Sequence, residues 1–160
     1  MMNRIFDIVC ALITLIFLSP IFVIVSIILN LTGEGEIFYR QERVGRDGKI
    51  FGLYKFATML KDSPNIGTGI YTQKGDPRIL PFGQFLRKTK INELPQILNI
   101  LLGDMSLIGP RPLVPAQFNI YAEEARNIIM QVRPGLSGIG SIVFRDEETI
   151  VTNNPLGYKR

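Results

Sequence analysis

The distribution of apolar and polar positions divides the chain into a long apolar N-terminal segment and a mixed remainder. Residues 8–33 contain no charged side chain, and a helix of that length exceeds the roughly 30 Å hydrocarbon core of a bilayer. A secretory signal has a shorter apolar core, and a domain of this size could not cover so apolar a helix on all sides. The pattern therefore predicts that residues 1–33 insert into a membrane.

A Ser-Pro pair, Ser19-Pro20, falls near the middle of this apolar segment. Proline removes a backbone donor and clashes with the preceding turn, so we expect a bend here. Two alternatives follow: a kinked helix that spans the bilayer, or a re-entrant helix that leaves by the face it entered. Cations on both sides of the segment favour the re-entrant form with both ends in the cytoplasm; they are Arg4, Arg40, Arg43, Arg46 and Lys49.

The remainder of the chain, residues 34–160, begins with a predicted β-hairpin. Two short, aromatic-rich apolar stretches at 37–39 and 50–54 are separated by a segment that contains Asp47-Gly48, a pair typical of tight hairpin turns. Residues 62–75 are rich in Gly, Ser and Asn and predict a loop. Its length is typical of a mobile or functional element.

Amphipathic helices are expected after this loop. The first covers residues 79–87, with Pro81 in its first turn. The second runs from about 93 to 102, because leucines and isoleucines recur at helical spacing and Gly103 provides a C-terminal stop. A third helix is expected over 115–132.

The stretches around these helices complete the predicted fold. In residues 109–115, each residue that precedes a proline is expected to be extended, because proline disfavours a helical conformation there. Residues 133–144 predict a turn and a short strand. The fold class is therefore α+β and mostly α. It consists of an N-terminal membrane helix followed by a small domain of amphipathic, interfacial helices with a short β-hairpin.

Charge and composition narrow the possible chemistry. The 160-residue chain carries a formal charge of +4, which favours lipid phosphate, a phosphorylated substrate or nucleic acid as partner; the apolar anchor conflicts with nucleic acid. The sequence has no histidine and a single cysteine, Cys10, which excludes Ser-His-Asp and Cys-His catalysis, histidine-ligated zinc and an intramolecular disulfide. Catalysis must therefore use carboxylates, lysine, arginine, hydroxyls or a hard metal ion.

Residues 87–96, RKTKINELPQ, combine phosphate-binding and catalytic residue types. Three cations precede a predicted helix N-terminus, whose free N–H groups and dipole favour anions. Glu93 and Asp104 are carboxylates that could ligate Mg²⁺, and Arg111, between two prolines, suits bidentate phosphate binding. A structural alternative stays open, because Asn92 is a preferred N-cap residue and Glu93 in a first turn interacts favourably with the dipole.

Four stretches of the chain resemble the bacterial sugar transferases, specifically the small monotopic phosphoglycosyl transferases that act on polyprenyl phosphate. They are RIFDIVCALITLIFLSP (4–20), FYRQERVGRDGKIFGLYKF (38–56), DPRILPFGQFLRKTKINELPQILNILLGDMSLIGPRP (76–112) and RPGLSGIGSI (133–142). The resemblance implies transfer of a sugar phosphate from a nucleotide-diphospho-sugar, usually a UDP-sugar, to undecaprenyl phosphate, with Mg²⁺ as cofactor and UMP as product.

The same resemblance implies where the protein acts. It implies a re-entrant helix broken at Ser19-Pro20 and a catalytic domain, residues 34–160, on the cytoplasmic face of the bacterial inner membrane. It also implies a role in starting polysaccharide assembly, as in lipopolysaccharide or capsule biosynthesis. Family members continue beyond the equivalent of FRDEE at 144–148, so we expect a C-terminus shortened relative to the family.

Site residues also follow from the resemblance. In the family an Asp-Glu pair opens a helix, and the Asp attacks the sugar-proximal phosphate to form a covalent phosphosugar intermediate. Here Asn92 occupies the position of the nucleophile, while Glu93 matches the Glu and would act at the Mg²⁺ centre or as the surviving carboxylate. The matched phosphate or nucleotide contacts are Lys55, Arg78, Arg87 and Arg111, and Ser19 and Pro20 would set the membrane bend.

Asn92 is the most consequential departure from the family pattern, because an amide is a very poor nucleophile toward phosphorus. Three possibilities stay open: Glu93 attacks in its place, the group passes directly between bound substrates, or the chain is catalytically inactive. An inactive homologue would bind lipid phosphate or scaffold other glycan-assembly enzymes. Two further departures are Ala57, in place of the Arg of the usual KFR segment, and Ser141, in place of a usual Gln.

Overall fold

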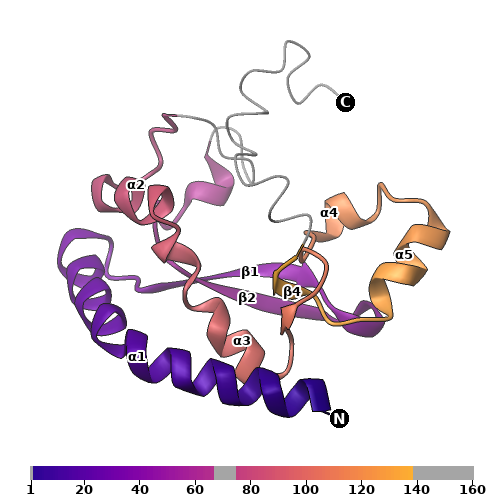
Figure 1. Ribbon diagram of the computed structural model, residues 1–160. Helices are drawn as coiled ribbons and strands as arrows, with labels where there is room; N and C mark the ends of the chain where they lie inside the picture. The colour runs from indigo at the N-terminus through magenta and orange to yellow at the C-terminus, as the bar shows by residue number, and fades with distance from the viewer. Residues whose placement is uncertain (1, 67–74, 139–160) are drawn as a thin grey trace.

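The computed structural model describes residues 2–66 and 75–138 (Figure 1). These residues are mostly helical and include one small antiparallel sheet, so the coarse fold class is confirmed. The helices and strands are α1 (Met2–Thr32), β1 (Phe38–Val44), β2 (Ile50–Phe56), α2 (Pro81–Lys88), α3 (Gln96–Leu102), β3 (Ser106–Ile108), α4 (Pro115–Phe118), α5 (Glu123–Met130) and β4 (Gly135–Ser137). Three short 3₁₀ turns join them: η1 (Arg46–Gly48), η2 (Ser63–Asn65) and η3 (Ile91–Glu93).

The apolar segment forms the long helix α1. Residues Arg4–Thr32 have a mean hydropathy of 3.0 and are long and apolar enough to cross a membrane. The helix is not interrupted at Ser19-Pro20, although its axis curves toward α2 (Figure 1). The Ser19 hydroxyl donates a hydrogen bond of 2.8 Å to the Ile16 carbonyl, which is the acceptor that a backbone N–H at position 20 would otherwise use. The re-entrant course through a bilayer stays a prediction.

Two charged side chains fix the N-terminal part of α1 to the rest of the domain. Arg4 donates hydrogen bonds to two carbonyls in the last turn of α3, where a cation also interacts favourably with the helix dipole. The buried Asp7 carboxylate accepts hydrogen bonds from the Ser106 hydroxyl at 2.7 Å and the Leu107 N–H at 3.1 Å. Charged groups inside an apolar segment are thus satisfied by the domain that follows it.

The core lies between α1, the hairpin, α2 and α3, in two clusters. Side chains of α1 contribute to both of them, so both halves of the helix pack on the same domain. The first cluster contains Ala11, Leu53, Ile97, Ile100 and Met105. The second contains Val25, Leu29, Phe56 and Leu86.

The opposite side of α1 exposes large apolar side chains, which we call the outer apolar face. A soluble domain rarely leaves so large an apolar surface uncovered. The face is composed of Ile5, Phe6, Val9, Leu12, Ile13, Ile16, Phe17, Ile21, Val23, Ile24, Ile27 and Leu31.

The predicted β-hairpin is present, with strands longer than expected. β1 and β2 pair antiparallel from Phe38 opposite Phe56 to Val44 opposite Ile50. In the turn, Asp47 and Gly48 have φ angles of 57° and 72°, a left-handed backbone that Asp-Gly tolerates well. The 62–75 loop contains η2, and its residues 67–74 lie outside the part of the chain that the structure describes.

The helix expected over 79–87 is present as α2, but the one expected over 93–102 begins later. Residues 91–93 form the separate turn η3, Pro95 stands at the N-cap position of α3, and Gly103 ends that helix with φ 97°. Because proline lacks an N–H and constrains the residue before it, the helix starts only at this point. Asn92 lies inside η3 and is the N-cap of neither element, so the capping interpretation of Asn92 is wrong.

The single helix expected over 115–132 is also wrong. The chain forms two short helices, α4 and α5, separated by residues 119–122, with Ala122 extended at ψ 151°. α4 contacts β1, whereas α5 contacts the hairpin turn η1. One straight helix could not follow both parts of the hairpin, and tertiary packing overrides the local periodicity.

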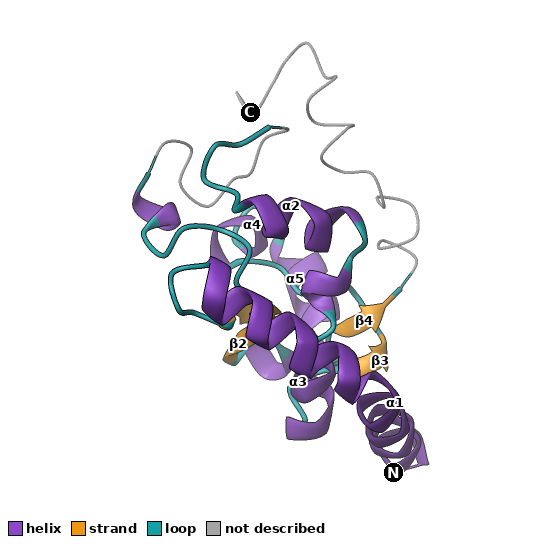
Figure 2. Cartoon of the chain, turned by 90° about the vertical axis from the view of Figure 1, so that its left-hand side faces the viewer, coloured by secondary structure: helices purple, strands orange, loops and turns teal. Residues whose placement is uncertain are grey.

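Of the turn and strand expected over 133–144, the structure describes residues 133–138, where β4 pairs in parallel with β3 (Figure 2). The residues from 139 onward lie outside the described part. Between β3 and α4 runs the proline segment, residues 109–114, without helix. Its backbone approaches β4 so closely that a Cβ atom at Gly135 would lie 2.0 Å from the Gly109 nitrogen.

Candidate active site

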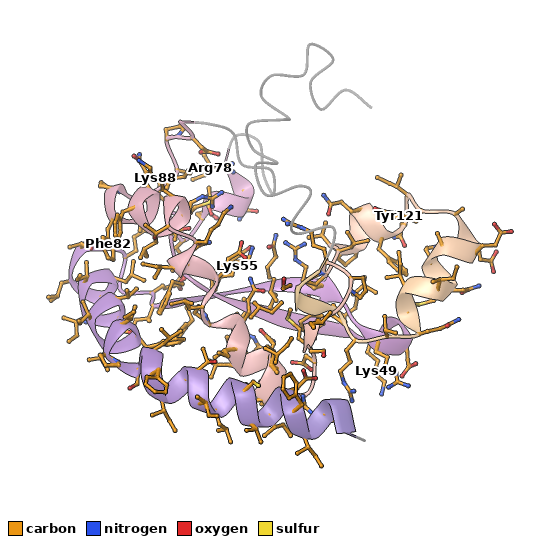
Figure 3. The ribbon with its side chains drawn as sticks, viewed as in Figure 1. Lys49, Lys55, Arg78, Phe82, Lys88 and Tyr121 are labelled. Carbon is orange, nitrogen blue, oxygen red and sulfur yellow. The ribbon has the colours of Figure 1, made fainter. Side chains whose placement is uncertain are left out.

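Side chains from the hairpin, η3, α3 and the proline segment converge on a pocket of about 30 Å³. Figure 3 shows Lys55 near the centre of the domain, surrounded by side chains from these elements. The chain positions that meet here are far apart in the sequence. The lining residues are Arg43, Leu53, Lys55, Glu93, Gln96, Arg111, Pro112, Gly135 and Leu136.

The strand register explains how the hairpin contributes. Gln41 pairs with Leu53, and alternate residues of a strand share a face, so Arg43, Leu53 and Lys55 lie on one side of the hairpin. From the opposite direction come Glu93, which ends η3, and residues from the start of α3. The hairpin thus supplies cations, and η3 supplies the carboxylate.

The pKa of Lys55 is shifted by its burial and by the charges around it. Burial lowers the pKa of Lys55 from 10.5 to about 8. The Glu93 carboxylate opposes this change, whereas the guanidinium groups of Arg43, Arg111 and Arg87 lower the pKa further. Lys55 therefore experiences the charges of three guanidinium groups and one carboxylate, and a bound phosphate would offset the repulsion among the cations.

The predicted site residues fall into two groups. Lys55, Glu93 and Arg111 line the pocket together. Arg87, on α2, donates a hydrogen bond of 3.8 Å to the Met59 sulfur and lies near enough to act on Lys55 through its charge. The sequence motif of the family is therefore assembled in space around Lys55.

Arg78 lies elsewhere. Its side chain is only 3% exposed, and its Nε and Nη2 atoms donate to the two carboxylate oxygens of Asp76 at 2.9 and 2.6 Å. Its Nη1 atom donates to the Ser63 carbonyl at 2.7 Å. These bonds fix the loop ahead of α2, and a nucleotide contact at Arg78 stays a prediction.

Glu93 and Asp104, the two carboxylates that could ligate Mg²⁺, do not line the same pocket. Glu93 precedes α3, while Asp104 follows it and accepts a hydrogen bond from Asn99 at 3.3 Å. Asp104 lines a different pocket, of about 550 Å³, with Arg40 and Glu42. The helix between the two carboxylates keeps them apart.

Asn92, at the position of the family nucleophile, is 7% exposed. Its Oδ1 atom is buried and has no hydrogen-bond partner among the residues that the structure describes. Leaving a buried acceptor unsatisfied costs about 1–3 kcal/mol, and such groups in native proteins often have a functional reason. The position is therefore not explained by local stability.

Among the polar side chains of the pocket, sequence reasoning missed Arg43 and Gln96. Arg43 was considered only as a cation that flanks the membrane segment. Alternation along β1 and the strand register could have placed it on the face of Lys55, but the register depends on the turn, which the sequence predicts only in outline. Gln96 follows Glu93 by about one helical turn.

The oxygen-bearing side chains of the pocket could hold a metal ion only together with a substrate. Within the described ranges 2–66 and 75–138, no group of three or more His, Cys, Asp or Glu side chains could hold a metal ion. Glu93 and Gln96 nevertheless offer oxygen atoms in the pocket, and Mg²⁺ is often held by one carboxylate together with substrate phosphates. The residues thus fit Mg²⁺ that arrives with a phosphate-bearing substrate.

Comparison with known proteins identifies the family of this chain. The family model described as bacterial sugar transferase matches residues 1–156. The chain is 35% identical over 94% of its length to the exopolysaccharide production protein ExoY of Sinorhizobium fredii and covers 72% of that protein.

Two further relatives are longer proteins, of which the chain spans about a third. It is 36% identical to the undecaprenyl-phosphate galactose phosphotransferase of Salmonella typhimurium, over 91% of this chain and 33% of the relative. It is 35% identical to the UDP-glucose:undecaprenyl-phosphate glucose-1-phosphate transferase of Escherichia coli, over 89% of this chain and 31% of the relative. The chain belongs to the bacterial sugar transferase family, a family of enzymes.

Proposed function

We propose that this enzyme transfers a sugar phosphate from a UDP-sugar to undecaprenyl phosphate and so starts the assembly of a glycan on a lipid carrier. The observation that carries this proposal is the convergence of Lys55, Glu93 and Arg111 in one pocket. The substrate classes are supported by relatives named for UDP-glucose, undecaprenyl phosphate and sugar-1-phosphate transfer. No contact in the described part of the chain favours the alternative of an inactive homologue.

Binding of the donor follows from the charges. Arg111 offers a planar guanidinium for two phosphate oxygens, and Lys55 offers an ammonium group beside it. When the diphosphate enters, its negative charges offset the repulsion among the four cations, and the pKa of Lys55 rises again because an anion stabilises the ammonium form. The pocket is therefore expected to bind the donor through its diphosphate.

In the proposed reaction a phosphate oxygen of undecaprenyl phosphate becomes bonded to the sugar-proximal phosphorus, and the bond from that phosphorus to UMP breaks. UMP leaves with the electron pair of that bond. Glu93 acts either as the attacking carboxylate of a first covalent step or as a group that aligns a direct transfer. Both routes require its charge.

Glu93 is also the residue that would hold Mg²⁺ together with the substrate phosphates. When bound, the ion would neutralise negative charge on the phosphoryl oxygens. The surrounding cations perform the same task from the protein side.

The membrane disposition is part of the proposal. Arg4 and Asp7 tie the first turns of α1 to the domain, and Leu29 packs on it near the other end. A helix held at both ends by one domain would not run straight across a bilayer with its ends on opposite faces. With the outer apolar face in the lipid, α1 would form a re-entrant anchor on the cytoplasmic side of the bacterial inner membrane.

Release of UMP tests the proposed function. Purified protein in detergent or nanodiscs is supplied with a panel of UDP-sugars, Mg²⁺ and undecaprenyl phosphate. We expect UMP from at least one donor only when the lipid is present. Glu93→Gln should lower kcat/KM by about 100-fold or more, because the carboxylate is lost from the pocket.

Glu123→Gln, which removes an exposed carboxylate on α5, is the matched control and should leave the rate unchanged. A native rate in Glu93→Gln would contradict the role of Glu93. Failure of every donor would contradict the transferase proposal and favour an inactive homologue that binds lipid phosphate.

A further inference from the structure

Arg43 connects the hairpin to the proline segment. Its Nη1 atom donates a hydrogen bond of 2.8 Å to the Pro112 carbonyl, and its Nη2 atom donates one of 2.6 Å to Oε1 of Gln41. At the next position, the Val44 N–H donates to the Leu113 carbonyl at 2.9 Å. One edge of the proline segment is thus bonded to β1 through both backbone and side chain.

The other edge of the proline segment is bonded to β4. The Gly135 N–H donates to the Pro110 carbonyl at 2.9 Å, and the Gly109 N–H donates to the Ser137 carbonyl at 3.0 Å. Arg111 lies between these two sets of bonds, flanked by prolines whose φ angles are fixed. Its backbone is therefore held from both sides, and Arg43 is a side-chain member of that support.

We infer that Arg43 is a positioning residue that holds the proline segment so that Arg111 lines the pocket with Lys55 and Glu93. This inference deepens the proposed function, since it assigns how the phosphate ligand Arg111 is placed. The planar fork of arginine is essential to the role, because one guanidinium must reach two acceptors at once. A lysine at this position could reach only one of them with comparable geometry.

Arg43 also acts on Lys55 through its charge. The groups that face Lys55 are Glu93 from η3, Arg43 from β1, Arg111 from the proline segment and Arg87 from α2. Among the arginines, Arg43 lowers the pKa of Lys55 most. The fork and the charge of Arg43 can therefore be separated, because lysine keeps the charge and loses the fork, whereas glutamine loses both.

Two measurements on the membrane-bound full chain distinguish these effects. NMR of the labelled Lys55 side chain gives its pKa, and titration calorimetry gives the affinity for inorganic pyrophosphate with Mg²⁺. Arg43→Gln should raise the pKa of Lys55 and weaken pyrophosphate binding about 5- to 30-fold, as expected for the loss of one or two kcal/mol. Arg43→Lys should weaken binding similarly but leave the pKa of Lys55 near its native value.

Arg46→Gln is the matched control, because it removes an exposed arginine from the hairpin turn; it should change neither quantity. Gln41→Ala keeps the Arg43 charge, removes one acceptor of the fork and should weaken binding by a smaller factor. Circular dichroism of all variants distinguishes a local effect on binding from misfolding.

Native affinity in Arg43→Lys would overturn the inference, as would an unchanged affinity and Lys55 pKa in Arg43→Gln. A protein without turnover whose pyrophosphate binding still follows this order of variants would contradict the proposed transfer and support the role of Arg43. Turnover with no change of pyrophosphate affinity in the Arg43 variants would support the proposed transfer and contradict the role of Arg43.

Discussion

Lys55 carries its charge in a partly buried pocket among three guanidinium groups. Burial lowers its pKa to about 8, so the unliganded side chain loses its proton as the pH rises through that value. A neutral amine no longer attracts phosphate, whereas arginine stays protonated throughout this range. The affinity of the pocket for anions should therefore fall on the alkaline side.

The pH dependence of the donor KM measures this effect. We expect the KM for the UDP-sugar to rise above about pH 8 in the native protein, because Lys55 must take up a proton to bind the diphosphate. In Lys55→Arg the rise should disappear from this pH range. An unchanged alkaline limb in Lys55→Arg would show that another group controls it.

Asn92, like Lys55, has a polar side chain in an unfavourable environment. The buried Oδ1 atom without a described hydrogen-bond partner belongs to the residue directly before Glu93. Asn92 itself is not among the residues that line the pocket. A carboxylate at this position would be a competent nucleophile, and nearby cations would stabilise its charge.

Asn92→Asp should therefore raise kcat at least about 10-fold, since an activated carboxylate replaces an inert amide. Intact-protein mass spectrometry after mixing with donor alone should show a phosphosugar adduct in this variant. Asn92→Ala, whose side chain has no nucleophilic atom, serves as the control. Loss of activity in Asn92→Asp would mean that the amide itself is needed.

At the scale of the elements, the sequence predicted those whose signals are local. Asp47-Gly48 marked the hairpin turn, Pro81 was expected in the first turn of the helix that became α2, and Gly103 marked the end of α3. The failures occurred where packing decides. Residues 115–132 have helical periodicity throughout, yet the hairpin needs a separate helix on its strand and on its turn.

The same division applies to the candidate site. The family motif identified Lys55, Glu93 and Arg111, which the fold brings together. Arg43 was missed because its role depends on the strand register and on a contact with Pro112, 69 positions away. Asp104 was considered as a second Mg²⁺ ligand, but it lies beyond α3 and lines a different pocket.

The close pairing of β3 with β4 gives a prediction at this scale. A Cβ atom at Gly135 would lie 2.0 Å from the Gly109 nitrogen, so Gly135→Ala must separate β4 from the start of the proline segment. We expect the free energy of unfolding to fall by about 1–3 kcal/mol and pyrophosphate binding to weaken. Thermal unfolding and calorimetry measure both, with Ser137→Ala on the exposed side of β4 as control; native stability in Gly135→Ala would contradict the tight pairing.

For the whole molecule, the apolar helix α1 and the pocket are parts of one packed unit. Arg4 of α1 binds the C-terminal end of α3, and Glu93 lies just ahead of the N-terminal end of that helix. α1 therefore holds the helix that directly follows the candidate carboxylate. This arrangement suits an enzyme whose donor is soluble and whose acceptor is a lipid.

Transfer of labelled phosphorus tests this function most directly. The enzyme is incubated with undecaprenyl phosphate and a UDP-sugar that carries ³²P in the phosphate next to the sugar, and the lipid and nucleotide products are separated. Sugar-phosphate transfer predicts that the label moves into the lipid fraction and that the released UMP is unlabelled. Label that stays with the nucleotide as UDP would show that only the sugar is transferred, and it would contradict a phosphoryl reaction at Lys55, Glu93 and Arg111.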